Sequence, residues 1–448
     1  MFPDARPVAL HATPLDVLAR WPADRPVTLL HSGRLNSAWS RYSVIAEPHS
    51  TLVCECGRTR WIGPPHPRNV TLSDDPLRSL DRIAHDDDAL YLGYLGYELA
   101  HTIEPVLGPA PPHPAGGPGW PDAVMHRCPA AWVYDHQESQ WLYLGPGEPA
   151  LPPASAAPPA TFHAAEPVAD HPRAAHESRV QQALDYIAAG DVFQVNLAQR
   201  FTAPFSGSPR ALFAALAEVS PAWYGAYVEL PRDGQTPRRA LASTSPELFL
   251  KLAPDRTVTT RPIKGTRPAG PNDPGAADAL RNSAKDAAEL NMIIDLLRND
   301  LGRVCSYGSV KVSQLRTIET HPTVHHGVAT ITGSLHPEKA LRHLLRATFP
   351  GGSITGAPKV RAMQIIRELE AGPRGPYCGA IGMVRGGGGH TEPTTAQFNI
   401  AIRTLLIDPG AQCAHFHVGG GIVADSHPAD EYEETLHKAE ALRRALTR

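Results

Sequence analysis

The sequence predicts an α+β (α/β) fold built on large, mainly antiparallel β-sheets. Short segments rich in β-branched and aromatic residues recur along the chain between glycine and proline breaks. The few strong helical patterns do not alternate regularly with these segments, as they would in a parallel α/β fold, and no internal repeat is visible. With 448 residues, of which 42% are hydrophobic, the chain can form a sizeable core.

The first part of the chain, residues 1–143, is predicted to be rich in strands. Its strand-like segments are "RYSVIAEP", "TLVCEC", "ALYLGYLGYEL" and "AAWVYDH". Residues 144–175 follow, in which proline and alanine are dense and no apolar period survives. This second segment is predicted to be a linker or a long surface excursion.

The remaining part, residues 176–448, is predicted to mix helices and strands. Val180, Leu184 and Ile187 have helical spacing, and Gly190 is expected to end that helix before a strand begins. "DAAELNMIIDLLRNDLG" carries a continuous apolar stripe and predicts a second helix, and a third helix should begin in "SHPADEYEE". Strands are predicted in "TVHHGVATITGSL", "CGAIGMV", "QFNIAIRTLLI" and "AHFHVGGGIV".

Composition and charge exclude several classes of function. The net charge is −3 and no basic patch is visible, so nucleic acid is not an expected partner. The N-terminus lacks the pattern of a signal peptide, and no stretch reaches the 18 or so apolar residues that cross a bilayer. The six cysteines are scattered, as is typical of reduced thiols. We therefore expect a cytoplasmic protein without a membrane segment.

Two glycine-rich stretches are candidates for ligand binding. In "TFPGGSITGAPKVRAM", Gly351 and Gly356 have the spacing of a phosphate loop, but the lysine comes too late for a nucleotide site. Thr355 is predicted to cap the following helix, whose free amides either cradle an anion or simply begin a helix. In "HVGGGIV", Gly419, Gly420 and Gly421 either expose backbone amides to a ligand or form a bulge.

Acidic residues at helical spacing suggest a metal site. Glu431, Glu434 and Lys438 lie on one face of the predicted C-terminal helix. Glu289 lies beside the apolar stripe of another helix and should point inward. Two buried carboxylates from different helices repel unless a cation joins them, and oxygen ligands favour Mg²⁺. The alternative is that these acids favour the helix dipole and that Glu434 and Lys438 form an ordinary surface pair.

The histidine pair in "TVHHGV" is less informative. His325 and His326 are neighbours in a predicted strand, so their side chains should point to opposite faces. One of them should face the sheet interior, either as a hydrogen-bonded core residue or as a general acid–base group.

Taken together, these segments resemble the chorismate-utilising enzymes, a family that includes anthranilate synthase component I and aminodeoxychorismate synthase component I. The matching stretches are "GDVFQVNLAQRF", "STSPELFL", "RPIKGTRPAG", "KDAAELNMIIDLLRNDLG", "TVHHGVATITG", "TFPGGSITGAPKVRAM", "FNIAIRT" and "GGGIVADSHPADEYEETLHKA". They follow the family's order over most of residues 175–445. "LLHSG" and "YLGYLGYE" resemble the family more loosely. The resemblance implies two large sheets packed on each other, with helices outside and the two ends of the chain interwoven.

The resemblance also implies a set of site residues. Glu289 and Glu434 look like Mg²⁺ ligands, with Glu431 close by, and the metal would hold the ring carboxylate of chorismate. The implied pocket for the rest of the substrate contains Tyr377, Arg403, Gly419, Gly420, Gly421, Thr355, Gly356 and Lys438.

Three further residues take roles from the same resemblance. Glu247, in "SPELF", resembles the acid that helps the ring hydroxyl leave, and His326 resembles the histidine of the family's H-L-V-S strand. Ser32, in "LLHSG", is a candidate contact in a tryptophan pocket that some members have. The chain departs from the family at Gly327 and Ala329, where leucine and serine are usual, and at Leu290, where asparagine is frequent.

Lys264 implies which branch of the family the chain resembles. Anthranilate synthases resemble "PIAGT", whereas aminodeoxychorismate synthases resemble "PIKGT", which is the pattern here. The implied reaction joins ammonia to carbon 4 of chorismate by two displacements. Lys264 attacks carbon 2 as the 4-hydroxyl leaves with a proton from Glu247, and ammonia then expels the lysine. The alternatives are anthranilate synthesis and a non-catalytic chorismate-binding regulatory subunit.

The source of the ammonia is expected to be another chain. The sequence contains no G-x-C-x-G amidotransferase elbow. We therefore expect a separate glutamine amidotransferase subunit as partner, and a product that feeds para-aminobenzoate and folate synthesis.

Overall fold

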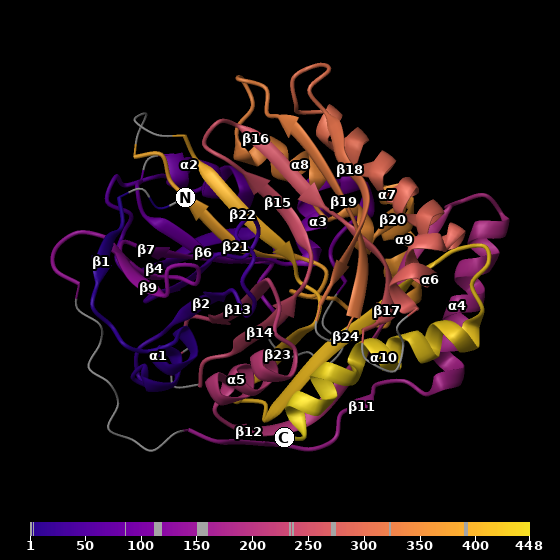
Figure 1. Ribbon diagram of the computed structural model, residues 1–448, viewed down its shortest axis with the longest axis horizontal. Coiled ribbons are helices and arrows are strands. Elements are labelled where there is room, and N and C mark those ends of the chain that lie inside the picture. The colour runs from indigo at the N-terminus through magenta and orange to yellow at the C-terminus, as the bar shows by residue number, and fades with distance from the viewer. Residues whose placement is uncertain are drawn as a thin grey trace.

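The computed structural model describes residues 2, 4–85, 87–111, 119–149, 160–232, 234, 237–269, 275–321, 324–388 and 393–448. Two large sheets dominate this part of the chain, and every strand pairing in both sheets is antiparallel. The predicted fold class is therefore confirmed. Figure 1 shows the two sheets with helices around them.

The first sheet has 13 strands among the described residues. In spatial order they are β1 (Arg6–Val8), β9 (Gln140–Leu144), β8 (Ala131–Asp135), β3 (Tyr42–Ala46), β2 (Thr28–His31), β13 (Tyr224–Glu229), β14 (Ala240–Ser245), β23 (Thr404–Asp408), β24 (Cys413–Ile422), β12 (Gln194–Gly207) and β10 (Phe162–Ala164). β11 (Val168–Ala169) and β20 (Gly356–Ala357) also pair with β12. Two of these short strands, β10 and β11, belong to the predicted linker, so part of the linker lies along β12.

The second sheet has 11 strands among the described residues. In spatial order they are β17 (Ile263–Pro268), β19 (Val324–Ser334), β16 (Thr257–Arg261), β15 (Leu248–Leu252), β22 (Thr395–Ile400), β21 (Ala380–Arg385), β6 (Leu90–Leu95), β7 (Ala123–Cys128), β4 (Ser50–Glu55) and β5 (Arg58–Ile62). β18 (Lys311–Thr320) pairs with β19. Each sheet joins a strand from residues 1–143 to a strand from residues 176–448. The pairs are β2–β13 in the first sheet and β6–β21 in the second.

Apolar side chains fill the space between the two sheets. One cluster joins Tyr94 and Val124 of the second sheet to Val228 and Leu241 of the first. At roughly 25 cal/mol for each Å² of apolar surface removed from water, such clusters are the main favourable contribution to folding. This packing explains why the strands, buried on both faces, read as nearly continuous apolar runs.

Helices cover the outer faces of both sheets. They are α1 (Pro14–Arg20), α2 (Pro76–His85), α3 (Ala100–Ile103), α4 (Arg173–Ala188), α5 (Pro209–Val219), α6 (Ala276–Asn282), α7 (Ala284–Gly302), α8 (Leu341–Thr348), α9 (Lys359–Leu369) and α10 (Pro428–Leu446), with short 3₁₀ turns at Tyr97–Leu99, Pro105–Leu107 and Gly352–Ile354. α5 and α10 pack on the first sheet, and α7 packs against β17 and β19 of the second. None of the described helices is long and apolar enough to cross a membrane.

One strand prediction was wrong. "QFNIAIRTLLI" is two strands, β22 and β23, which belong to different sheets. The chain turns between them at Arg403, which has a positive φ of 50°. An apolar run that is buried throughout carries no signal for the point at which it changes sheets. This turn brings Arg403 between the two sheets, close to the candidate site.

Candidate active site

Lys264 lies at an irregular point of β17, where its pairing with β19 shifts register. The side chain is 11% exposed, and its Nζ lies 3.9 Å from Glu289 Oε2. Burial lowers the pKa of Lys264, against the opposing pull of Glu289. Gly327 explains one departure from the family pattern, because a Cβ there would lie 2.6 Å from the Lys264 carbonyl oxygen. Lys264 is thus a largely buried amine and not a solvated surface charge.

Glu247 follows β14 and is buried, as a proton donor in a substrate pocket would be. Ser353 Oγ donates a hydrogen bond of 2.6 Å to Glu247 Oε1. Burial raises the pKa of Glu247 to about 7, and the nearby Lys264 opposes that rise. A substantial fraction of this carboxyl is therefore protonated at neutral pH. Ser353 was not predicted, since a serine in a glycine-rich loop has no distinctive pattern.

The three predicted metal ligands differ in exposure. The Glu289 side chain on α7 is 17% exposed, and Glu431 on α10 is buried and accepts a 2.6 Å hydrogen bond from Ser426 Oγ. The Glu434 side chain is 51% exposed and lies 2.6 Å from Lys438. The expectation that Glu434 is a buried carboxylate was therefore wrong, since it lies near the start of α10, where that helix reaches solvent.

The acidic side chains nevertheless gather around Gly420. A Cβ on Gly420 would lie 2.9 Å from Glu431 Oε2 and 3.4 Å from Glu434 Oε1. The charge of Glu434 adds to burial in raising the pKa of Glu289. The two α10 carboxylates thus flank Gly420, with Glu289 within electrostatic reach of Glu434, and carboxylate oxygens suit Mg²⁺ chemically. In the part of the chain that the structure describes, no three His, Cys or carboxylate groups are close enough together to hold a metal ion.

Lys438 places a positive charge beside the glycine strand. Its Nζ donates a 2.7 Å hydrogen bond to the Gly419 carbonyl oxygen as well as pairing with Glu434. The absence of a side chain at Gly420 leaves room for the α10 carboxylates, and its absence at Gly421 leaves room for Lys264 from the other sheet. This strand is therefore where the predicted residues of the two sheets meet.

His326 lies on β19, within electrostatic reach of Arg403. Thr266 Oγ1 lies 2.9 Å from His326 Nδ1, and His326 Nε2 is buried without a hydrogen-bond partner among the described residues. Burial and the charge of Arg403 hold the pKa of His326 well below its ordinary value, so the imidazole is neutral. Burial also lowers the pKa of Arg403. His325, one residue away, is not fully buried, as the strand prediction required.

Thr355 and Gly356, the first residue of β20, lie beside the start of β12, and Tyr377 lies on a loop next to β24. Tyr377 is buried, and its ring stacks on His417 with centroids 5.2 Å apart. The prediction that Thr355 caps α9 was wrong, because Thr355 Oγ1 donates to the Gly351 carbonyl oxygen and Pro358 holds the cap position. Gly356 has a φ of 147°, and a Cβ there would lie 2.1 Å from the Gln194 carbonyl oxygen. Only glycine suits that position.

Ser32 lies at the end of β2 in the first sheet. Its hydroxyl donates a 2.7 Å hydrogen bond to the Tyr42 carbonyl oxygen, and its backbone N–H donates to Ser43 Oγ. These two bonds give Ser32 a structural role. The tryptophan pocket stays a prediction.

Sequence reasoning missed Gln194, the first residue of β12. Its side chain is fully buried, and neither amide atom has a hydrogen-bond partner within the described residues. A Cβ on Gly421 would lie 2.9 Å from Gln194 Nε2 and 2.9 Å from Lys264 Nζ. The signal was its place in "GDVFQVNLAQRF", one of the stretches that resemble the family, four residues after the predicted helix end at Gly190.

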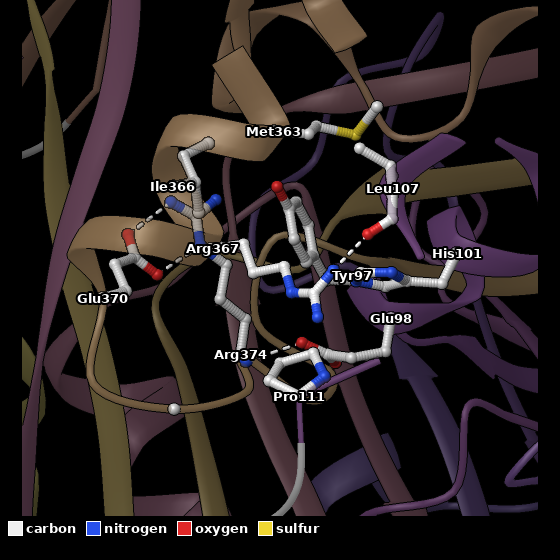
Figure 2. A pocket seen from close by; sticks show the side chains of 11 residues that line it. Tyr97, Glu98, His101, Leu107, Pro111, Met363, Ile366, Arg367, Glu370 and Arg374 are labelled. Carbon is white, nitrogen blue, oxygen red and sulfur yellow. Dashed lines mark hydrogen bonds and ion pairs between the residues drawn. The ribbon is translucent and has the colours of Figure 1, made fainter. Parts of the chain in front are cut away.

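A separate pocket lies between α9 and the segment around Tyr97 (Figure 2). Arg374 forms one wall, and its guanidinium pairs with Glu370 while its backbone N–H donates to Glu98. The same guanidinium donates to the carbonyl oxygens of Ile354 (3.0 Å) and Asn196 (2.9 Å). None of the predicted site residues lines this pocket, but Arg374 braces the loop and strand that carry Thr355 and Gln194.

Comparison with known proteins assigns the family. The model of the chorismate binding enzyme family matches residues 31–444. The chain belongs to this family. It is 37% identical over 441 residues to aminodeoxychorismate synthase component 1 of Escherichia coli, which covers 93% of this chain and 92% of that protein. It is also 37% identical over 389 residues to anthranilate synthase component 1 of Streptomyces coelicolor, covering 80% of this chain and 72% of that protein.

A solved structure agrees with this assignment. Anthranilate synthase component I of Streptococcus pneumoniae TIGR4 superimposes with a TM-score of 0.73 at 28% identity, covering 96% of this chain and 97% of that chain. The protein is therefore a chorismate-utilising enzyme with the architecture of that family.

Proposed function

We propose that this chorismate-utilising enzyme is the component of an aminodeoxychorismate synthase that converts chorismate and ammonia to 4-amino-4-deoxychorismate. The observation that carries the proposal is the buried position of Lys264, with its Nζ 3.9 Å from Glu289 and within electrostatic reach of Glu247. A lysine in this setting is suited to nucleophilic catalysis, because burial favours its neutral form.

In the first displacement, the neutral Lys264 amine bonds to carbon 2 of the ring. The ring double bonds shift, and the bond from carbon 4 to its hydroxyl oxygen breaks. Glu247 supplies the proton with which the hydroxyl leaves as water, consistent with a pKa of about 7. Ammonia then bonds to carbon 4, the double bonds shift back, and the bond between Lys264 and carbon 2 breaks, while the new nitrogen loses one proton and Glu247 regains the proton that it gave.

Two sets of groups in the site would hold the two carboxylates of chorismate. Arg403, the amides of Gly419 to Gly421 and the Tyr377 hydroxyl are suited to the pyruvyl carboxylate. Mg²⁺, held by Glu289 and Glu434 with Glu431 nearby, would bind the ring carboxylate. Lys438 already pairs with Glu434 and would share that carboxylate with the metal.

The ammonia would come from a glutamine amidotransferase partner. The E. coli relative is named component 1, which supports a second component for this chain as well. Purified alone, the chain should use ammonium but not glutamine, and glutamine-dependent turnover by the isolated chain would contradict this part of the proposal.

Anthranilate synthesis is the second candidate, since an anthranilate synthase component 1 is equally identical over a shorter span. Incubation with chorismate, Mg²⁺ and ammonium separates the two. Mass spectrometry should detect 4-amino-4-deoxychorismate, which is not strongly fluorescent. Strongly fluorescent anthranilate as the main product would reject the first candidate.

A further inference from the structure

The buried amide of Gln194 is a polar group without a partner in a crowded site. Its side chain has no exposed surface, and both amide atoms lack hydrogen-bond partners in the described residues. A buried amide left without partners destabilises the fold, because its atoms have lost their hydrogen bonds to water. Such an amide therefore favours a hydrogen bond that the catalytic cycle provides.

Lys264 is a polar neighbour of this amide. Gln194 Nε2 and Lys264 Nζ both lie 2.9 Å from the position of a Cβ on Gly421, so both groups border the space that this glycine leaves open. A turn of the amide by 180° exchanges its oxygen and nitrogen, and no other hydrogen bond fixes its orientation. The amide oxygen can thus be presented to the Lys264 amine without loss of an existing bond.

We propose that Gln194 is a positioning residue for Lys264, whose amide oxygen accepts an N–H of the amine and directs the nitrogen lone pair toward the substrate. A neutral amine has two N–H donors and one lone pair. If Gln194 holds one N–H, rotation about the last bond of the lysine is restricted and the lone pair is aimed. The inference rests on the proposed function, in which Lys264 is the nucleophile.

The test measures the covalent step directly. Wild type and Gln194→Met are mixed with chorismate and Mg²⁺ without ammonia, and the adduct on Lys264 is followed by rapid quenching and mass spectrometry. Methionine keeps the length of the side chain and removes the amide. Adduct formation should slow about 10- to 100-fold, the loss expected when a reacting group is misdirected, while the dissociation constant for chorismate stays within about twofold.

The control is Gln199→Met. Gln199 is a second buried glutamine on β12, but its amide donates to Thr435 Oγ1. It should form the adduct at nearly the wild-type rate, whatever its effect on stability. A double variant, Lys264→Ala with Gln194→Met, completes the cycle. Its residual turnover should equal that of Lys264→Ala alone, because a residue that acts through Lys264 has no effect once Lys264 is absent.

The outcomes separate this inference from the proposed function. If wild type forms no adduct, the proposed nucleophile is wrong and Gln194 has nothing to position. If wild type forms the adduct and Gln194→Met forms it equally fast, only the positioning role is wrong. A weaker affinity for chorismate with an unchanged rate of the covalent step would make Gln194 a substrate contact, which also overturns the inference.

Discussion

The Lys264 Nζ lies 3.9 Å from the Glu289 carboxylate, and the two residues come from different elements, β17 and α7. Both side chains are largely buried, so each charge is partly compensated by the other. Removing either residue leaves an opposite charge in the site without its nearest partner. The functional effects of the two substitutions should nevertheless differ, because the proposed roles are nucleophile and metal ligand.

Replacing Lys264 by alanine should reduce formation of 4-amino-4-deoxychorismate by several orders of magnitude, since the covalent route is lost. The substitution also recreates "PIAGT". Ammonia can then reach carbon 2 directly, so we expect a partial switch to carbon 2 amination, with some anthranilate. Mass spectrometry and fluorescence of the products measure both effects. Lys311→Ala, at an exposed lysine on β18, is the control. An undiminished rate in Lys264→Ala would remove lysine from the mechanism.

Replacing Glu289 or Glu434 by alanine should lower turnover at least about 100-fold at saturating Mg²⁺, because each variant loses a carboxylate oxygen donor. Glu433→Ala is a matched control on the same helix, since Glu433 pairs with Arg173 at the surface. Its turnover should stay within about twofold of wild type. Calorimetry with Mg²⁺ provides a readout that is independent of activity. Full turnover in a chelator, or unimpaired Mg²⁺ binding by both variants, would reject the metal site.

The Glu247→Gln variant should lose about 10²- to 10⁴-fold in turnover, the usual contribution of a general acid. The wild-type rate should fall as the pH rises through about 7, where Glu247 loses its proton.

The stability of the fold should also depend on the protonation of Glu247. Because burial raises the pKa of Glu247 in the folded state, its stabilising contribution is complete below the unfolded pKa and is lost as the pH rises through about 7.

Thermal unfolding checks this sign. Between pH 5 and pH 8, the melting temperature of wild type should fall relative to that of Glu247→Gln, which has no titrating proton at this position. Parallel melting curves over that range would show that the Glu247 carboxyl titrates normally.

Replacing Arg374 by methionine should destabilise the fold by about 3–5 kcal/mol, because it leaves the buried Glu370 carboxylate without its partner. The carbonyl oxygens of Ile354 and Asn196 lose donors as well. Denaturant unfolding measures the difference. Arg367→Met on α9 is the control, since Arg367 is exposed and should cost less than about 1 kcal/mol. Equal stability of the two variants would mean that the buried arginine is not needed to brace the site.

The sequence by itself determined the fold class and the main helices, and it predicted a set of candidate site residues. Helical spacing marked the helices before Gly190 and around Leu297, and both are present as α4 and α7. Resemblance to the family's motifs implied candidate roles for Lys264 and Glu247, and helical spacing pointed to the α10 acids. Local pattern is sufficient for these predictions, since helix periodicity and motif spacing involve neighbours along the chain.

Only the tertiary structure decided how far each group is removed from water and what it faces. Glu431 is buried while Glu434, three residues later, is half-exposed, because packing of α10 against β24 covers one of them and not the other. Gln194 and Lys264 border the same space beside Gly421, although β12 and β17 belong to different sheets. Burial and long-range contacts depend on segments far apart in the chain, so local sequence carries no signal for them.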